Sequence, residues 1–302
     1  MPILSKARTM LAAMRPGQWV KNALVAAPLF FAWGDPGQGL GSKAALAAAA
    51  AKAVAATLAF CAVSSGIYLF NDIRDRREDA RHPVKRFRPI ASGALSVGSA
   101  AALAALLLAA GIGVAFAAST AFGVVAAAYA AMQVLYTLVL KRVVLLDVIV
   151  IAIGFVMRAV GGALAIGVAI SPWLVLCTFF LSLFLALCKR RQEKITRDEN
   201  EQRRSLKSYS VALLDILIAI SSTLAIASYA LYAVSAETVA KFGTHRLAYT
   251  VPFVVFGVFR YVHLVFVESR GERPERTLLT DGAILATVFL YLVAFAVILV
   301  TR

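Results

Sequence analysis

The stretch NDIRDRREDARHPVKRFRPIASG, residues 71–93, places four acidic and seven basic side chains directly after a long apolar run. If the helix of that run continues, successive side chains advance by about 100°, and the oxygen-bearing side chains then share one face. These are Asn71, Asp72, Asp75 and Asp79. Carboxylates held close together repel one another unless a cation neutralises them, and Mg²⁺ prefers oxygen ligands. The spacing therefore predicts a Mg²⁺ site formed by these residues.

The second half of the same stretch carries the opposite charge. Its basic side chains are Arg81, Lys85, Arg86 and Arg88. A diphosphate needs a metal on some of its oxygens and cations on the others. One anionic, metal-bridged ligand would therefore explain both signs of charge. A solvated loop whose acidic and basic residues pair with one another is the alternative interpretation.

The rest of the chain is strongly apolar. Of its 302 residues, 61% are hydrophobic, and apolar runs of membrane-spanning length recur from end to end. These runs are too long and too continuously apolar for the strands of an outer-membrane barrel. We therefore predict an all-α polytopic membrane protein, a bundle of about nine transmembrane helices in a single domain, residues 1–302. The predicted spans are 19–33, 44–70, 94–117, 120–140, 143–166, 172–188, 210–236, 247–267 and 281–300.

The basic residues are unevenly distributed. A net charge of +15 invites a nucleic-acid-binding interpretation, but we reject nucleic acid as a partner because these residues lie in short loops between spans, where they determine topology. Most of the 31 lysines and arginines fall on one face when the N-terminus is placed in the cytoplasm. This predicts a bacterial inner-membrane (cytoplasmic membrane) protein with a cytoplasmic N-terminus and a non-cytoplasmic C-terminus. The charged loops 71–93 and 189–209 then both lie in the cytoplasm.

The run Asn71-Asp72-x-x-Asp75-x-x-x-Asp79, followed by HPVKRFRPIASG, resembles the first aspartate-rich motif of the UbiA superfamily of intramembrane prenyltransferases. The fold of that superfamily, a bundle of nine transmembrane helices, agrees with the independent estimate from the apolar runs. Its typical members transfer a prenyl group from a prenyl diphosphate to an aromatic acceptor. They also carry a second aspartate-rich motif in a later cytoplasmic loop.

The later loop of this chain departs from that pattern. It begins Lys189-Arg190-x-x-Glu193 where the superfamily shows aspartates, and the nearest acidic cluster lies further along, at Asp198, Glu199 and Glu201. This departure resembles one branch of the superfamily, the decaprenyl-phosphate phosphoribosyltransferases. That branch uses phosphoribosyl diphosphate (PRPP) as donor and a polyprenyl phosphate as acceptor. The stretches RPGQWVKN, residues 15–22, and RAVGG, residues 158–162, fit the same branch.

The resemblance implies a Mg²⁺-dependent displacement of diphosphate at ribose C1 by the lipid phosphate, a precursor step for lipid-linked arabinose. The catalytic candidates are two carboxylates that could stabilise positive charge near C1, Asp75 and Glu193, and the choice between them stays open. The candidate substrate-binding residues are Lys21, Asn22, Lys85, Arg86, Arg88, Tyr136, Lys141, Arg158, Lys189 and Arg190. The implied partners are PRPP, a polyprenyl phosphate lipid and the bilayer. The oligomeric state, including a homo-oligomer, is left open.

Arg158 is the most informative single cation, because it lies inside the apolar run IVIAIGFVMRAVGG. An intramembrane arginine is costly, so a functional role is the default interpretation. Its structural alternative is snorkelling, or pairing with Asp147 about three turns earlier on the same span. Asp215 and Arg260 also lie in apolar runs, and we interpret both as structural.

Two further functions stay open beside the phosphoribosyltransferase. The first is an aromatic-acceptor prenyltransferase of the same superfamily, which would share the fold and the metal motif and differ in the donor. The second is a transporter or channel. A transporter predicts polar residues through the middle of several spans, and most spans of this chain have none.

Overall fold

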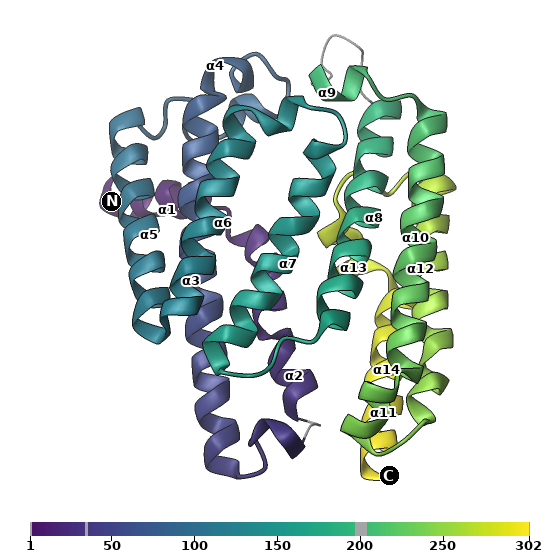
Figure 1. The fold of residues 1–302 in the computed structure, drawn as a ribbon. Helices are drawn as coiled ribbons and strands as arrows, with labels where there is room; N and C mark the ends of the chain where they lie inside the picture. Colours follow the sequence, from purple (N-terminus) through teal and green to yellow (C-terminus); the bar gives the residue numbers. More distant parts are fainter. Residues whose placement is uncertain (1, 34–35, 197–203, 302) are drawn as a thin grey trace. The chain divides into compact units, whose positions relative to one another are not determined.

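The structure is a computed structural model that describes residues 2–33, 36–196 and 204–301 (Figure 1). All the regular elements within these ranges are helices. Eight helices of the described chain are long and apolar enough to cross a membrane. They are α3 (Lys43–Arg74), α5 (Val97–Ala118), α6 (Thr120–Leu138), α7 (Leu146–Ile166), α8 (Pro172–Thr196), α10 (Val211–Val234), η6 with α12 (Arg246–Phe266) and α14 (Gly282–Val300). The prediction of an all-α polytopic membrane protein is therefore confirmed.

Shorter helices join or precede these spans. They are α1 (Pro2–Met14), η1 (Pro16–Ala26), α2 (Ala27–Trp33), η2 (Pro36–Gln38), α4 (Arg76–Asp79), η3 (Lys85–Phe87), η4 (Leu140–Arg142), α9 (Arg204–Lys207), α11 (Ala236–Phe242) and α13 (Pro274–Thr280). Two of the long helices run past their predicted apolar spans into charged sequence. The first, α3, continues to Arg74, and α8 continues to Thr196. Lysine, arginine, glutamine and glutamate are good helix formers, so charge does not end a helix.

The first predicted span, 19–33, has an unexpected local structure. Residues Pro16–Ala26 form the 3₁₀ helix η1, and only Ala27–Trp33 are α-helical. Arg15 adopts a left-handed conformation (φ 56°) that separates α1 from η1. Pro16 follows it at the first helical position, where a missing N–H costs nothing. Eleven residues rise about 22 Å in a 3₁₀ helix and about 16 Å in an α-helix, so this winding gives the segment extra reach.

The 3₁₀ winding also determines which side chains of η1 are buried. Residues three apart lie in line along a 3₁₀ helix. Asn22 and Val25, at that spacing, are 1% and 0% exposed. Trp19, three residues before Asn22, donates a hydrogen bond from its indole Nε1 to Ser65 Oγ of α3 at 3.0 Å. One edge of η1 thus faces the helix that carries the charged motif.

The chain divides into two compact units. Unit 1 comprises Met1–Leu29, Ala47–Lys141 and Met157–Val168, and unit 2 comprises Phe30–Leu46, Arg142–Val156 and Ala169–Arg302. The single domain over residues 1–302 stays a prediction.

In unit 1 small residues let helices approach closely. A Cβ atom placed on Gly111 of α5 would lie 2.8 Å from the carbonyl oxygen of Ala59 on α3, and one placed on Gly66 of α3 would lie 2.7 Å from Leu108 Cγ. Such contacts replace the hydrophobic driving force that is missing in lipid. The glycine at 111 in the Ala-rich run of α5 therefore serves helix packing.

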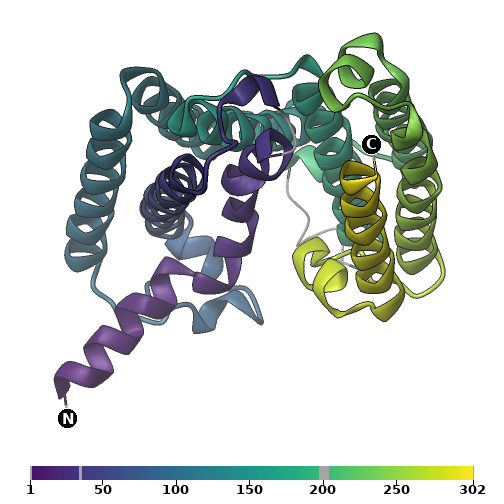
Figure 2. The same ribbon diagram turned by 90° about the horizontal axis from the view of Figure 1, so that it is seen from below.

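Figure 2 shows α1, in purple, extending from this unit with its N-terminus at the tip.

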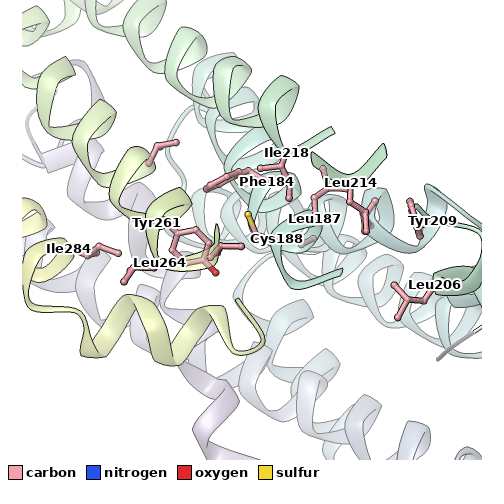
Figure 3. Close-up of a cluster of buried hydrophobic side chains, with 14 residues drawn as sticks. Phe184, Leu187, Cys188, Leu206, Tyr209, Leu214, Ile218, Tyr261, Leu264 and Ile284 are labelled. Carbon is pink, nitrogen blue, oxygen red and sulfur yellow. The ribbon is translucent and has the colours of Figure 1, made fainter. Parts of the chain in front are cut away.

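The core of unit 2 joins five long helices, α7 (through Val148), α8, α10, α12 and α14. Phe184 of α8 and Tyr261 of α12 stack edge to face with ring centroids 5.6 Å apart. Leu214 of α10 and Ile284 of α14 complete the cluster (Figure 3). Leu206 and Tyr209, which lie around the end of α9, are buried in the same cluster. This burial fixes the segment after α9 against the charged end of α8.

We expect Gly162→Ala to destabilise the protein. A Cβ atom at Gly162 of α7 would lie 1.9 Å from the carbonyl oxygen of Val25, and backbone cannot move as cheaply as a side chain. Overpacking of this kind costs about 1–3 kcal/mol, which would lower the thermal unfolding temperature measured in detergent. Gly113→Ala is the matched control, because nothing lies within 4 Å of a Cβ atom there. Equal unfolding temperatures for the two variants would contradict the close approach of α7 and η1.

Candidate functional site

The acidic motif of unit 1 spans a short break between two helices. The first, α3, ends at Arg74, Asp75 follows as the N-cap of α4, and Asp79 is the last residue of α4. The helical hydrogen bonds continue across this break, from Asp75 N–H to the Asn71 carbonyl at 2.9 Å and from Asp79 N–H to the Asp75 carbonyl at 2.8 Å. The helix of the second span therefore continues through the motif as expected, except at Asp75, which separates α3 from α4.

Arg88 joins two of the motif's carboxylates. Its Nη1 lies 2.6 Å from Asp79 Oδ2 and 3.2 Å from Asp72 Oδ1. Both aspartates are 3% exposed, so two buried carboxylates converge on a single guanidinium nitrogen. Asp72 also accepts a hydrogen bond and ion pair from Arg15, and Lys85 Nζ lies 3.9 Å from Asp79 Oδ1. Arg88 and Lys85, both predicted as substrate-binding residues, thus lie next to the motif.

Asp75 has a separate partner. Lys141, which follows α6 in η4, places its Nζ 2.7 and 2.8 Å from the two oxygens of the Asp75 carboxylate. The Asp75 side chain is 21% exposed, in contrast to the buried Asp72 and Asp79. Residues 66 positions apart in the chain therefore form the more accessible end of this cluster.

The predicted metal ligands have the right chemistry for Mg²⁺. Asp72 and Asp79 supply hard carboxylate oxygens, and they already share one cationic partner, so they lie close enough to share a cation. Asn71 is half-buried beside them. In the arrangement seen here, arginine and lysine lie against these carboxylates, and the described residues contain no group of three His, Cys, Asp or Glu side chains arranged to hold a metal. The residue types fit the ion, and their use as ligands stays a prediction.

Arg158 lies at the centre of a polar network inside unit 1. It is 5% exposed, and its Nε donates to Asn22 Oδ1 at 2.8 Å. Its Nη2 donates to Tyr129 Oη at 2.6 Å, and the guanidinium lies 4.8 Å from the centre of the Tyr129 ring. Ser64 Oγ donates to the same Asn22 oxygen at 3.4 Å. These neutral groups hold the cation in place.

The structure does not pair Arg158 with Asp147. Asp147 Oδ2 instead accepts a hydrogen bond from Arg190 Nε at 2.9 Å, and Asp147 Oδ1 accepts one from the Tyr209 hydroxyl at 2.8 Å. Of the structural alternatives for Arg158, pairing with Asp147 is therefore wrong, because that carboxylate is bound by Arg190 and Tyr209 instead.

The cluster in unit 2 is almost completely buried. Arg190 is 2% exposed and binds two carboxylates, Asp147 and Glu193, which are 0% and 1% exposed. The Glu193 contact, from Arg190 Nη1 to Oε2, measures 2.7 Å. Ser205 Oγ lies 3.4 Å from Asp147 Oδ2. A buried ion pair persists when its remaining donors and acceptors are satisfied, which is the arrangement here.

Tyr209 connects this cluster to a strained turn. Its hydroxyl donates to Asp147 Oδ1 at 2.8 Å and accepts from the Leu145 N–H at 2.8 Å. Burial, together with the hydrogen bond to Asp147, raises the pKa of Tyr209 above its ordinary value, so the hydroxyl stays protonated and can donate. Leu145 has a φ of 68°, a region that leucine rarely adopts. The Tyr209 hydrogen bond helps to hold that conformation.

The other candidate residues are spread over several environments. Lys21, Tyr136 and Lys189 are half-buried, and Arg86 is exposed with its guanidinium 4.8 Å from the centre of the Phe87 ring. Asp198, Glu199 and Glu201 lie outside the described residues.

Two charged residues interpreted as structural have clear partners. Asp215 pairs with Arg191 at 2.6 Å. Arg260 pairs with Asp281 at 2.8 Å. Both pairs fit the structural interpretation.

Three residues have a larger part in these clusters than sequence reasoning assigned to them. Arg15 belongs to the stretch RPGQWVKN, but nothing in its sequence neighbourhood links it to Asp72, which is 57 positions away. Tyr129 gave no signal, because a tyrosine inside an apolar span is usually interpreted as packing. The position of Asp147 on the span of Arg158 suggests Arg158 as its partner, and sequence spacing does not reveal its contact with Arg190, 43 positions away.

Comparison with known proteins agrees with this architecture. The profile of the UbiA prenyltransferase family matches residues 23–293. The decaprenyl-phosphate phosphoribosyltransferase of Mycolicibacterium smegmatis is 35% identical over 282 residues, which cover 90% of this chain and 86% of the relative. The enzyme of the same name from Corynebacterium glutamicum is 35% identical over 297 residues, 95% of this chain and 86% of the relative.

Solved structures resemble the chain in fold. A UbiA homologue from Archaeoglobus fulgidus, solved with DMAPP and Mg²⁺, superimposes with a TM-score of 0.70 at 18% identity, covering 96% of this chain and 99% of that chain. The same homologue with GPP and Mg²⁺ gives a TM-score of 0.70 at 19% identity, with the same coverage. At such identity the likeness concerns the fold, and it confirms the predicted UbiA-like helical architecture.

We expect Arg190→Met to destabilise the protein strongly. Methionine would leave Asp147 and Glu193 buried without their cation, and breaking a buried pair in this way costs about 3–5 kcal/mol. Thermal unfolding in detergent measures the loss. Arg191→Met is the matched control on the adjacent position, because its partner Asp215 is 37% exposed and stays hydrated. If both variants unfolded at the same temperature, the buried cluster would not be the stabilising one.

Proposed function

Because the chain belongs to the UbiA prenyltransferase family, we propose that it transfers the 5-phosphoribosyl group of PRPP to a polyprenyl phosphate, with release of diphosphate. The observation that carries this proposal is the 35% identity to two decaprenyl-phosphate phosphoribosyltransferases along almost the whole chain. The family is one of membrane-embedded transferases, and the eight apolar helices agree with an integral, multi-pass membrane protein.

The central problem of this reaction is the repulsion between two anionic reactants. The unit 1 cluster offers cations for that purpose: Arg15, Arg88, Lys85 and Lys141 all lie on the acidic motif. Guanidinium groups bind phosphate oxygens in a two-pronged geometry, which suits a diphosphate. A phosphate oxygen of the lipid is already anionic at neutral pH, so the nucleophile needs no strong general base.

The acidic half of the cluster is proposed to hold Mg²⁺. Asp72, Asp79, Asn71 and Asp75 supply its oxygen ligands in this proposal, and the ion would neutralise the charge that develops on the leaving diphosphate. The Mg²⁺ named in the solved Archaeoglobus fulgidus homologue supports a divalent ion in this fold. Arg88, which binds both buried aspartates, would then be free to bind the diphosphate instead.

Exposure favours Asp75 over Glu193 as the carboxylate near ribose C1. The Glu193 side chain is 1% exposed and is bound to Arg190, whereas the Asp75 side chain is 21% exposed. A group that stabilises positive charge on the substrate must be able to reach it. We therefore assign Glu193 and Arg190 to support of the fold around α8, and Asp75 to the reaction. This assignment remains part of the proposal.

The setting of the reaction follows the positive-inside rule. The charged loops are proposed to lie on the cytoplasmic face of a bacterial inner membrane, with the N-terminus inside and the C-terminus outside. The product would be a ribosylated lipid that later steps convert to lipid-linked arabinose. Homo-oligomerisation stays an open prediction.

An assay with purified protein tests the proposal. With labelled PRPP, a polyprenyl phosphate and Mg²⁺, we expect a ribosylated lipid, and removal of divalent ions with EDTA should abolish it. We expect Asp75→Asn to lower kcat by about 100-fold or more, because it removes a group that stabilises charge in the transition state. Asp215→Asn is the matched control, since it removes a carboxylate of unit 2 that pairs with Arg191.

The competing function makes the opposite prediction. An aromatic-acceptor prenyltransferase would give no ribosylated lipid and would instead consume a prenyl diphosphate in the presence of an aromatic acid. That result would reject PRPP as the donor. Substrate flux into vesicles that survives Asp75→Asn without any turnover would point to a transporter.

A further inference from the structure

A cationic groove lies in unit 2, in the segment that joins α12 to α14. It is an open groove with a volume of about 530 Å³, lined by residues between 269 and 280. Ligand sites commonly have volumes of about 300–1,000 Å³. The lining contains three arginines, Arg270, Arg273 and Arg276, and a single acidic side chain, Glu272. The groove is therefore positively charged.

The walls of the groove are held in place by main-chain contacts. Arg270 N–H donates to the Leu264 carbonyl of α12 at 2.9 Å. Thr277 Oγ1 of α13 donates to the Arg270 carbonyl at 2.7 Å. Gly271 is buried against α8, where a Cβ atom would lie 3.1 Å from Gln192 Cβ and 3.2 Å from the Cys188 carbonyl oxygen. The loop is thus fixed to three helices, and the groove is preformed.

Two carboxylates that flank the lining, Asp281 and Glu268, are already engaged. Asp281 accepts from Arg260 Nη2 at 2.8 Å and also caps α14 by accepting from the Ile284 N–H at 3.0 Å. These contacts hold the pKa of Asp281 below its ordinary value, so it stays ionised. Glu268 lies 3.3 Å from Arg260 and 3.5 Å from Arg270.

Two arginines of the groove remain available for a ligand. Arg273 and Arg276 are exposed, and neither forms an ion pair with any residue in the described ranges. Arg270 is held at one wall by a hydrogen bond to Thr280 Oγ1 at 3.1 Å. Planar guanidinium groups in such an arrangement suit the oxygens of a phosphate.

The surroundings favour a lipid as the source of that phosphate. The segment connects two membrane-spanning helices, Arg246–Phe266 and Gly282–Val300. It also exposes Val267 and Leu279, by 69% and 55%. Large apolar side chains beside a cationic site fit acyl chains next to a headgroup, and basic pockets at the ends of transmembrane helices are known to bind anionic headgroups.

We propose that the groove formed by Arg270, Arg273 and Arg276 binds the phosphate headgroup of an anionic membrane lipid. The lipid bound there would be a regulator or structural ligand held in unit 2. The proposal does not depend on the transferase reaction, because a protein with any other activity would present the same groove.

Binding of a short-chain phosphatidylglycerol to the full-length protein in neutral-lipid nanodiscs tests this proposal. We expect Arg273→Gln/Arg276→Gln to weaken binding by about tenfold or more, and either single substitution to weaken it by less. The matched control is Arg76→Gln/Arg77→Gln, which removes the same charge from two exposed arginines of α4. The control should bind like the wild type. Equal affinities for the wild type and the groove variant, or equal losses in the groove and control variants, would overturn the proposal.

Two further ligands distinguish the source of the phosphate. Glycerol 3-phosphate presents the same phosphate chemistry without acyl chains, and it should bind much more weakly than the lipid. If it bound equally well, the site would belong to a soluble phosphate compound and the lipid proposal would be wrong. A polyprenyl phosphate that loses affinity in the groove variant to the same extent as phosphatidylglycerol supports a general anionic-lipid site. Both Gln substitutions are on exposed side chains, so an unchanged unfolding temperature confirms that the variant is folded.

Discussion

The charge cluster of unit 1 depends on the ion pairs of Arg88 with Asp72 and Asp79. Two aspartates that are each 3% exposed cannot stay ionised next to one another unless a cation separates them. Arg88 meets this need with a single nitrogen, and Arg15 adds a second cation to Asp72. The bonds link the end of α3, the short helix α4 and the loop that precedes α5. They also join the junction of α1 and η1 to the same place, so one charge cluster organises four segments.

Both units bury an arginine, and they neutralise it differently. Arg190 is bound by two carboxylates, Asp147 and Glu193. Arg158 is held by an asparagine, a tyrosine hydroxyl and the face of the same tyrosine ring. A cation held by neutral groups keeps more of its field than one that is bound by carboxylates. Asn22 and Tyr129 therefore offset the charge of Arg158 less than Asp147 and Glu193 offset that of Arg190.

Periodic and local properties could be predicted from the sequence, and contacts between distant residues could not. The eight long spans of the described chain follow from apolar runs, since each run falls within the range of lengths that can cross the bilayer core. The neighbourhood of Asp72, Asp75 and Asp79 follows from helical spacing. Lys141 was identified as a relevant cation, but its contact with Asp75 depends on how α6 packs against α3. The contacts of Arg15, Tyr129 and Asp147 likewise join residues that are far apart in the chain.

The 3₁₀ winding of η1 could not be predicted from the sequence, because the same apolar residues are compatible with an α-helix and with a 3₁₀ helix. As a consequence, the winding of η1 sets the distance between the end of α1 and the start of α2. Rewinding its eleven residues as an α-helix would shorten it by about 5 Å. Deleting one residue would rotate everything before it by about 120°, turning Arg15 away from Asp72. This segment should consequently tolerate exchange of its outward side chains far better than any change in its number of residues.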